Sequence, residues 1–386
     1  MEAFAIARVQ LSFASITATP TGPERFATAF YTTLWAEAAG TRDLFPAGME
    51  GMRHRFTTAV GWVINRLTDV DAVEAFLGQL ARDHRKYGVR PDHFRAAGHA
   101  LLVAVRECTP LILWTAALER TWSRVIGRLV EAMAVACEED DLPASWGATV
   151  VGHERVLPDL AIIRLETDSP IPFHAGQYMS VQIPQRPNMW RYLSAAIPPN
   201  PHGQIEFHVR RVSTGWVSPA LVGEVSVGDR WTIGPPLGGL AVDLESGQDA
   251  LMIASGTGLA PMRAQIMEMA MRGNNPRVHL FYGGQYPCDL YDLETLWHIA
   301  MTNPWLTIVP VIEQPENPWW HPFPPKEAPP GLNRPMYGKL GKVAAQFGTW
   351  ADRQIQIAGS PSMIRTTLYA LSAAGTPRQN IRFDPL

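Results

Sequence analysis

The chain has 386 residues, of which 46% are hydrophobic and 18% are charged, and its formal net charge is -3. These values indicate a globular protein of two or three domains, and they exclude a basic surface for nucleic acid or an anionic membrane. The three cysteines, Cys108, Cys137 and Cys288, are odd in number and lack metal-binding spacing, so we expect a reducing, cytoplasmic location. We also expect neither a signal peptide nor a segment that spans a bilayer.

The first part of the chain, up to about residue 143, has the apolar periodicity of α-helices. Between Pro23 and Glu139, apolar side chains recur at helical spacing, which predicts an all-helical domain. His84 follows Val73 by eleven residues, about three helical turns, so its ring continues an apolar face. A histidine that faces inward is either a hydrogen-bonded core residue or a metal ligand, and the helical pattern alone leaves both open.

After a short hinge at residues 143–146, the apolar period changes to the alternation of β-strands. Short strands separated by prolines and glycines predict an antiparallel β-barrel at residues 146–245. Three local motifs stand in this region, and each taken alone also fits a plain strand end, strand or helix cap. They are Ala175-Gly-Gln-Tyr178-Met-Ser180, Arg191-Tyr192-Leu193-Ser194 and Gly215-Trp216-Val217-Ser218.

Residues 246–386 alternate strand-like apolar runs with helical segments, which predicts a parallel α/β domain. Strands are expected at residues 250–254, 278–284, 307–312 and from residue 354. The first strand leads into a glycine turn and then into a helical run at residues 262–269. Such a turn lets a pyrophosphate approach the backbone at a helix start, although many strand–helix turns look alike. The turn is Gly256-Thr257-Gly258-Leu259-Ala260-Pro261.

In this order, the helical domain, the barrel motifs and the glycine turn resemble the flavohaemoglobin family. In that family a globin is fused to a ferredoxin-reductase-like module for FAD and NAD. The resemblance implies that His84 ligates the iron of haem b, that Phe45 wedges the haem, and that Tyr31 donates a hydrogen bond to bound oxygen. Met52 would line the distal pocket.

The sequence departs from the family pattern on both sides of the expected haem. Met52 stands where the family usually has a glutamine, so Tyr31 is the one strong donor expected in the distal pocket. On the proximal side, Phe94 replaces a tyrosine, and the glutamate position falls near Val135, with Glu131 one turn earlier. A carboxylate bonded to a ligand histidine makes the imidazole more basic. We therefore expect a haem that behaves more like that of an oxygen-storage globin than that of a peroxidase.

For the barrel, the resemblance implies an FAD site made by the second and third motifs. Arg191 would meet the FAD phosphates bidentately and Ser194 would bond the edge of the flavin ring. Gly215, Val217 and Ser218 would cradle the pyrophosphate at a helix start.

The aromatic position of the flavin motif departs from the family order of arginine, any residue, tyrosine and serine. Here Tyr192 directly follows the arginine, and Leu193 takes the aromatic's place. A shift of one residue turns a strand side chain to the opposite face. We therefore expect the flavin to stack on Leu193, Tyr178 or another aromatic residue. Phe383 resembles the C-terminal aromatic that covers the flavin.

The resemblance assigns the nicotinamide dinucleotide to the glycine turn and to Gly359, at the end of a later strand. Ala358 replaces the cysteine that the family places beside the nicotinamide, which predicts slower hydride transfer. Gln285 carries no charge to meet a 2′-phosphate, so NADH is expected, with NADPH as the alternative. The expected contacts in the turn are Gly256, Thr257, Gly258 and Pro261.

These features predict three domains, a globin at residues 1–143, an FAD-binding barrel at 146–245 and an NAD-binding α/β domain at 246–386. The function implied by the resemblance is electron transfer from NAD(P)H through FAD to a haem that binds O2 and converts nitric oxide to nitrate. Two alternatives remain open. One is a flavin enzyme that uses a 2-hydroxy acid as donor or a quinone as acceptor, and the other is a globin that senses gas without catalysis. The sequence does not define the oligomeric state.

The segment between Glu313 and Tyr337 is rich in proline and contains Trp319 and Trp320. Proline-rich segments are stiff and resist regular structure. Two interpretations remain, a surface loop without chemistry and a lid whose tryptophans pack near the flavin or the globin.

Overall fold

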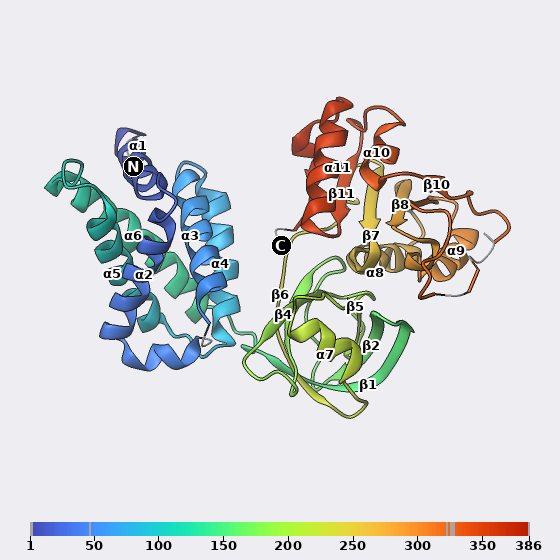
Figure 1. The fold of residues 1–386 in the computed structure, drawn as a ribbon, viewed down its shortest axis with the longest axis horizontal. Helices are drawn as coiled ribbons and strands as arrows, with labels where there is room; N and C mark the ends of the chain where they lie inside the picture. The colour runs from blue at the N-terminus through green and yellow to red at the C-terminus, as the bar shows by residue number, and fades with distance from the viewer. Residues whose placement is uncertain (1–2, 46–47, 322, 325–328, 385–386) are drawn as a thin grey trace. The chain divides into compact units, whose positions relative to one another are not determined.

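The computed structural model describes residues 3–45, 48–321, 323–324 and 329–384. The chain divides into two compact units, Met1–Ser145 and Trp146–Leu386. Figure 1 shows that the first unit is helical and that the second contains both β-sheets. This agrees with the predicted order of an all-α globin, an antiparallel barrel and a parallel α/β sheet.

The first unit confirms the all-helical prediction and adds a helix, α1, before the expected start at Pro23. Helix ends follow from local sequence: Asp69 caps α4 through the N–H of Ala72, and Thr115 caps α6 through the N–H of Leu118. The elements are α1 (Ala3–Thr17), α2 (Gly22–Glu37), η1 (Ala39–Leu44), α3 (Glu50–Asn65), α4 (Val70–Arg85), α5 (Pro91–Cys108) and α6 (Ala116–Glu138).

The core of this unit is rich in aromatic rings. Trp122 is fully buried on α6, and its indole N–H donates to Ser12 Oγ at 2.9 Å, which ties α1 to the bundle. A second group of rings comes from α2, α3 and the segment after η1. Its members are Phe30, Tyr31, Trp35, Phe45 and Phe56.

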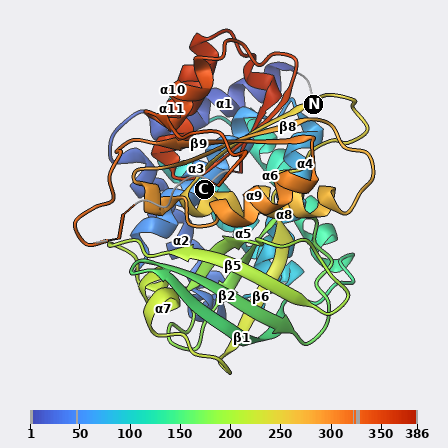
Figure 2. The same cartoon turned by 90° about the vertical axis from the view of Figure 1, so that its right-hand side faces the viewer.

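The first sheet of the second unit is an antiparallel six-stranded sheet with the order β4-β3-β6-β1-β2-β5. A bridge between Ala195 and Phe207 joins the chain after β4 to β5, so the two edge strands meet as in a barrel. Figure 2 shows α7 beside these strands. The elements are β1 (Trp146–Leu157), β2 (Leu160–Thr167), β3 (Tyr178–Gln182), β4 (Trp190–Ser194), β5 (Gln204–Arg210), α7 (Val217–Gly223) and β6 (Arg230–Leu237).

The second sheet is parallel, with the order β10-β9-β8-β7-β11-β12. Alternate residues of β7 face opposite layers: Met252 packs with α8 and α9, and Ile253 packs with α10 and α11. All four predicted strands are present. The elements are β7 (Ala250–Ser255), η2 (Gly256–Gly258), α8 (Leu259–Ala270), β8 (Val278–Gly284), η3 (Pro287–Asp289), α9 (Leu293–Thr302), β9 (Leu306–Ile312), β10 (Met336–Tyr337), α10 (Leu340–Ala345), β11 (Gln354–Ala358), α11 (Pro361–Ala373), η4 (Arg378–Asn380) and β12 (Ile381–Arg382).

The described part of the proline-rich segment is held as a surface loop. Asn317 accepts the N–H of Cys288 at 2.8 Å and donates to the carbonyl of Phe323 at 3.0 Å. Trp319 is 93% exposed and does not pack as the lid interpretation requires, whereas Trp320 is 37% exposed. Residues 322 and 325–328 lie outside the described part. Across the described residues, the longest helices are too short or too polar to cross a membrane.

Candidate functional site

His84 lies in the last turn of α4, where the sequence pattern places an inward-facing ring. Its Nδ1 lies 2.7 Å from the carbonyl oxygen of Leu80, one turn earlier. A carbonyl only accepts, so Nδ1 carries the ring proton and Nε2 keeps its lone pair. Burial lowers the pKa of His84, and this outweighs the opposite effects of the Leu80 bond and of Asp83. A neutral imidazole with Nε2 available is the donor that haem iron requires.

The other histidines of the first unit are less suited to hold a metal. His54 is exposed on α3, and His99 is exposed and pairs with Glu37. His93 uses its Nδ1 to accept the N–H of Arg90 at the start of α5. Among the described residues, no three His, Cys, Asp or Glu side chains gather into a metal site. A single histidine beside a porphyrin does not need such a cluster.

The proximal side of His84 is aromatic. The ring of Phe94 is buried, and its centroid lies 6.3 Å from that of His84. Phe94 therefore packs near the histidine but offers it no hydrogen bond. Tyr87 lies between α4 and α5, and its ring centroid is 6.1 Å from that of His84. Burial raises the pKa of Tyr87. The sequence analysis did not select Tyr87, although its spacing of three residues from His84 would have marked it.

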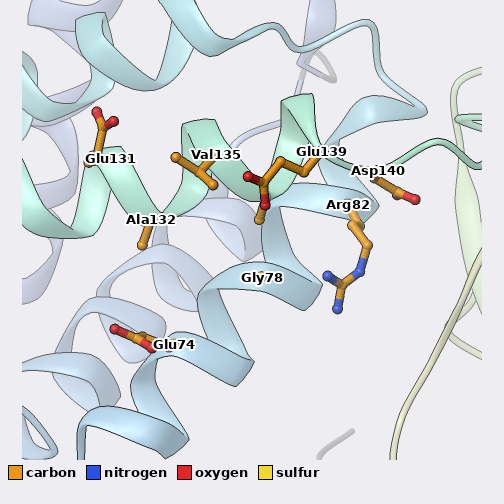
Figure 3. A pocket seen from close by; sticks show the side chains of 9 residues that line it. Glu74, Gly78, Arg82, Glu131, Ala132, Val135, Glu139 and Asp140 are labelled. Carbon is orange, nitrogen blue, oxygen red and sulfur yellow. The ribbon is translucent and has the colours of Figure 1, made fainter.

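Neither Val135 nor Glu131 supplies the missing proximal carboxylate. Both side chains are exposed on α6, where they line a surface groove of about 550 Å³ with Gly78 and Arg82 of α4. Figure 3 shows both residues at this groove. Leu80's carbonyl, a neutral acceptor, is thus the partner of the His84 ring.

Tyr31 is the polar group of a buried aromatic cluster. It is only 4% exposed, and its ring packs against Phe30, Trp35, Phe45 and Phe56. Burial raises the pKa of Tyr31 to about 12, so the phenol keeps its proton at neutral pH. A protonated phenol in an apolar pocket can donate a hydrogen bond to a small polar ligand.

Phe45 and Met52 border the same pocket. Phe45 ends η1 and meets Tyr31 edge to face at 5.4 Å, and Met52 packs against the aromatic core from α3. Arg55, one turn after Met52, is a residue that the sequence analysis missed. Its charge acts on both Tyr31 and Tyr87, so it lies within electrostatic range of both. The helical spacing of three from Met52 was the available signal.

In the second unit, β3 and β4 place three of the expected flavin residues on one face. Tyr178 is paired with Ser194 across the strands, and the rings of Tyr178 and Tyr192 meet edge to face at 5.4 Å. Leu193 has the opposite orientation and packs on the barrel core. This orientation argues against Leu193 as the stacking group and leaves the two tyrosines as the aromatic surface.

Arg191 is exposed on β4, and its side chain makes no hydrogen bond or ion pair with any residue that the structure describes. It is therefore available to an anion. In the third motif, Gly215 begins the turn into α7, where Val217 is buried in the barrel core. Ser218 Oγ accepts the N–H of Val212 at 3.0 Å, so this hydroxyl holds the turn together.

The glycine turn has the predicted strand, turn and helix geometry. Gly256 has a positive φ of 54°, and Gly258 lies so close to the carbonyl of Ala358 that a Cβ would overlap it. No side chain caps the start of α8 at Gly258. Thr257 is half-buried in the turn and Pro261 is buried in the first turn of α8. The N–H of Leu259 donates to the carbonyls of Gly256 and Thr257, and the start of α8 without a side-chain cap suits a pyrophosphate.

The later strand β11 ends beside this turn, because β7 and β11 are parallel neighbours. Gly359 follows β11 and contacts Ser255 and Met363, which leaves no room for a side chain. Arg210, at the end of β5, was missed by the sequence analysis. A Cβ on Gly256 would lie 3.9 Å from its Nη1, so a cation faces the turn. Nothing in the local sequence marked it, because this proximity joins two sheets.

Buried charges connect the two sheets of the second unit. Arg263 on α8 donates to Asp292 at 2.7 Å and lies 3.2 Å from Glu206 on β5. Glu206 also accepts from Arg164 at 2.8 Å and lies 3.0 Å from His208. Despite its burial, these partners lower the pKa of Glu206 to about 2. The charges fix the glycine turn relative to the barrel.

Three family models match successive parts of the chain. The globin model matches residues 28–133, the oxidoreductase FAD-binding domain matches 147–241, and the oxidoreductase NAD-binding domain matches 252–322.

Three relatives each match between 56% and 66% of the chain. A ferredoxin–NAD(P)⁺ reductase of Metapseudomonas resinovorans is 32% identical over 61% of this chain and 68% of its own length. A phenol hydroxylase P5 protein of Acinetobacter pittii is 29% identical over 56% of this chain and 64% of its own length. A flavohemoprotein of Bordetella pertussis is 26% identical over 66% of this chain and 68% of its length. The chain thus spans about two thirds of the length of these relatives.

One solved structure resembles the whole chain. A flavohemoglobin from Malassezia yamatoensis with bound FAD and haem has a TM-score of 0.75 at 14% identity, and covers 99% of this chain and 98% of its own. At this identity the likeness concerns the fold. Together with the three domain matches in order, it leads to one assignment: the chain belongs to the flavohaemoglobin family, with haem, FAD and a nicotinamide dinucleotide as its cofactors.

Proposed function

We propose that this flavohaemoglobin is a nitric oxide dioxygenase that uses NADH. The reaction would consume one NADH and two molecules each of nitric oxide and O2, and release two nitrate ions. When bound, the cofactors would supply hydride donation, hydride acceptance with division into single electrons, and binding of a diatomic gas. We assign these roles to residues 246–386, 146–245 and 1–143, respectively.

The observation that carries the proposal is the pairing of a neutral His84 with a buried, protonated Tyr31. His84 offers Nε2 because Leu80 fixes its tautomer. Tyr31 offers one donor in a pocket of aromatic rings, a setting that favours a small, weakly polar ligand such as O2. Phe45 and Met52 would pack against the haem, and Arg55 would pair with an acidic group at the edge of the haem.

In the reductase part, we propose that FAD lies on the face of Tyr178, Tyr192 and Ser194, with Arg191 at its phosphates. Gly215, Val217 and Ser218 would shape the turn beside the pyrophosphate. The nicotinamide nucleotide would lie on the glycine turn, with Gly359 at its far end and Arg210 as a cation near its phosphates. Gln285 offers no charge for a 2′-phosphate, which supports NADH over NADPH.

A second function has a specific observation in its favour. The reductase relatives are more similar to this chain, at 32% and 29%, than the flavohemoprotein at 26%. A flavin reductase that delivers electrons to another acceptor, such as a quinone, would explain this, and a hydroxy acid could serve as donor.

One experiment separates the two functions. The full-length protein loaded with haem and FAD is mixed anaerobically with NADH or with lactate, and flavin bleaching and haem reduction are followed by absorbance. The reduced protein then receives O2 and nitric oxide, and nitrate is measured. Bleaching by NADH, followed by haem reduction and nitrate formation, supports the dioxygenase. Bleached flavin without haem reduction, or bleaching by lactate alone, would reject it.

A further inference from the structure

The C-terminal segment after β12 contacts the barrel through one carboxyl group, that of Asp384. Its Oδ1 accepts the N–H of Gly239 at 3.1 Å. Its Oδ2 lies near Gly238, where a Cβ would be 2.8 Å from this oxygen and 2.8 Å from Cε1 of Tyr178. Gly238 also has a φ of 88°, which favours glycine. Asp384, Tyr178 and the turn at residues 238–239 therefore meet at one point.

The neighbouring residue points to the other sheet. Phe383 packs against the cluster formed by β7, β11, α10 and α11. Two consecutive residues thus join the barrel to the parallel sheet, and they do so beside the tyrosine face. The fold positions Asp384 here because β12 pairs in parallel with β11 and directs the chain end back toward β3 and β6.

The surroundings of Asp384 are poor in charge. Burial raises its pKa to about 6, and the Gly239 N–H opposes this only in part. The facing groups are the Tyr178 phenol on β3 and the backbone of the Gly238–Gly239 turn, while Arg382 on its own segment is exposed. Among the described residues, no charged side chain shifts its titration. The protonated carboxyl therefore suits this position better than the carboxylate does.

We propose that Asp384 is a positioning residue that latches the C-terminal segment onto the Gly238–Gly239 turn and so forms one wall of the flavin site beside Tyr178. This inference rests on the proposed placement of FAD at Tyr178 and Tyr192. Phe383 and Asp384 act as a pair: one anchors the segment on the parallel sheet, and the other closes it against the barrel.

The latch has a defined pH dependence. The pKa in the closed state is about 6, above the ordinary value of 3.8, so closure takes up a proton. The added stability is complete below pH 3.8 and is lost as the pH rises through 6. The segment should therefore hold FAD more firmly at pH 5 than at pH 8.

The first test measures FAD release from the full-length protein by the rise of flavin fluorescence after dilution. In the unmodified protein, release should be several-fold faster at pH 8 than at pH 5. Asp384→Asn keeps the acceptor and removes the charge, so release should be slow at both pH values. Asp384→Ala lacks the acceptor, so release should be fast at both. Asp352→Asn changes an exposed aspartate of the same unit and should behave as the unmodified protein.

A second readout does not need the flavin. Hydrogen exchange of the peptide with Gly239 is measured in the FAD-free protein and corrected for the intrinsic effect of pH. Protection should fall in Asp384→Ala and persist in Asp384→Asn. Equal exchange protection of the Gly239 peptide in all variants would show that Asp384 does not hold the segment on the turn. Changed protection with identical FAD release would show that the segment does not form a wall of the flavin site. Failure of every variant to bind FAD would instead reject the proposed function, while the exchange result would still decide the latch.

Discussion

The aromatic cluster around Tyr31 in the first unit and the junction between the two sheets of the second unit are both buried, but their chemistry differs. The cluster is formed by aromatic rings, with Tyr31 as its polar group. The junction contains Glu206, His208, Arg263 and Asp292, all buried and bonded to one another. One region is held by packing and the other by charge pairs that satisfy each other.

This difference corresponds to different requirements of the two regions. A pocket for a diatomic gas gains from low polarity, because one donor then decides where the ligand binds. A junction between two sheets must fix their orientation, and hydrogen-bonded charges do this with directional contacts. Loss of one charge leaves its partners buried and unpaired, whereas loss of one ring leaves a cavity. The two regions should thus respond differently to pH and to mutation.

The largest expected effect is in the first unit. Among the described residues of this unit, His84 is the histidine whose ring faces inward, so His84→Ala should yield a purified protein that contains FAD without haem. The measurement is the ratio of haem to flavin by pyridine haemochrome and flavin absorbance. His54→Ala, on the exposed face of α3, should keep both cofactors. Retention of stoichiometric haem by His84→Ala would exclude this residue as the iron ligand.

At the junction, Glu206→Gln should reduce the stability of the second unit by about 3 kcal/mol at neutral pH. The pKa of Glu206 is about 2 in the folded state, and its ordinary value, taken for the unfolded chain, is 4.5. Its contribution is complete above pH 4.5 and is lost as the pH falls toward 2. Thermal unfolding is followed through flavin fluorescence. The melting temperature should fall with pH in this range in the unmodified protein and not in the variant.

Glu154→Gln provides the matched control for this prediction. Glu154 also pairs with Arg164, at 3.5 Å, but it is 61% exposed. Exposed pairs contribute about 0–1 kcal/mol, so the control should differ little from the unmodified protein. Equal losses in both variants would mean that burial of the junction charges has no special effect. The haem absorbance melt should be unchanged in both.

Arg191→Gln should weaken FAD binding by about 1.5–3 kcal/mol, or roughly 10–100-fold, because a charge-assisted bond to phosphate is lost. Isothermal titration of the FAD-free protein measures the affinity. Arg211→Gln, at an exposed position just after β5, serves as the control for charge alone. Unchanged affinity in Arg191→Gln would place the phosphates elsewhere.

The smallest effect is expected in the aromatic pocket. Tyr31→Phe keeps the ring contacts and removes one donor, which is worth on the order of 1 kcal/mol, or about fivefold. The oxygen dissociation rate, followed by stopped-flow absorbance, should rise by this factor. Tyr87→Phe, beside His84, should leave that rate nearly unchanged. An unaltered rate in Tyr31→Phe would show that its hydroxyl does not meet the ligand.

The sequence predicted the elements that depend on local patterns. His84 followed from a helical spacing of eleven residues, and the glycine turn followed from small residues between an apolar run and a helix. The four strands of the parallel sheet were also found, because buried strands are continuous apolar runs. Helix α1 was missed, since its docking depends on Trp122, more than a hundred residues away.

The remaining features depend on contacts between residues that are distant in the sequence. Arg210 pairs with Asp289 across 79 positions of sequence, and Arg263 pairs with Glu206 across two sheets. Such partners have no fixed spacing, so periodicity does not reveal them. The orientation of Leu193 toward the barrel core depends on the pairing of β3 with β4. No local pattern marks Asp384, because its neighbours Gly239 and Tyr178 are distant in the sequence.

The close approach of Gly258 to the carbonyl of Ala358 restricts how this enzyme can diverge. A side chain at Gly258 would push the turn after β7 away from the end of β11, and Gly359 has a φ of 156° that favours glycine. In the proposed nucleotide site, a change of cofactor preference would therefore arise at other positions, such as Gln285. For anyone who wishes to convert the protein to another coenzyme, these two positions are the ones to leave out of a mutant library.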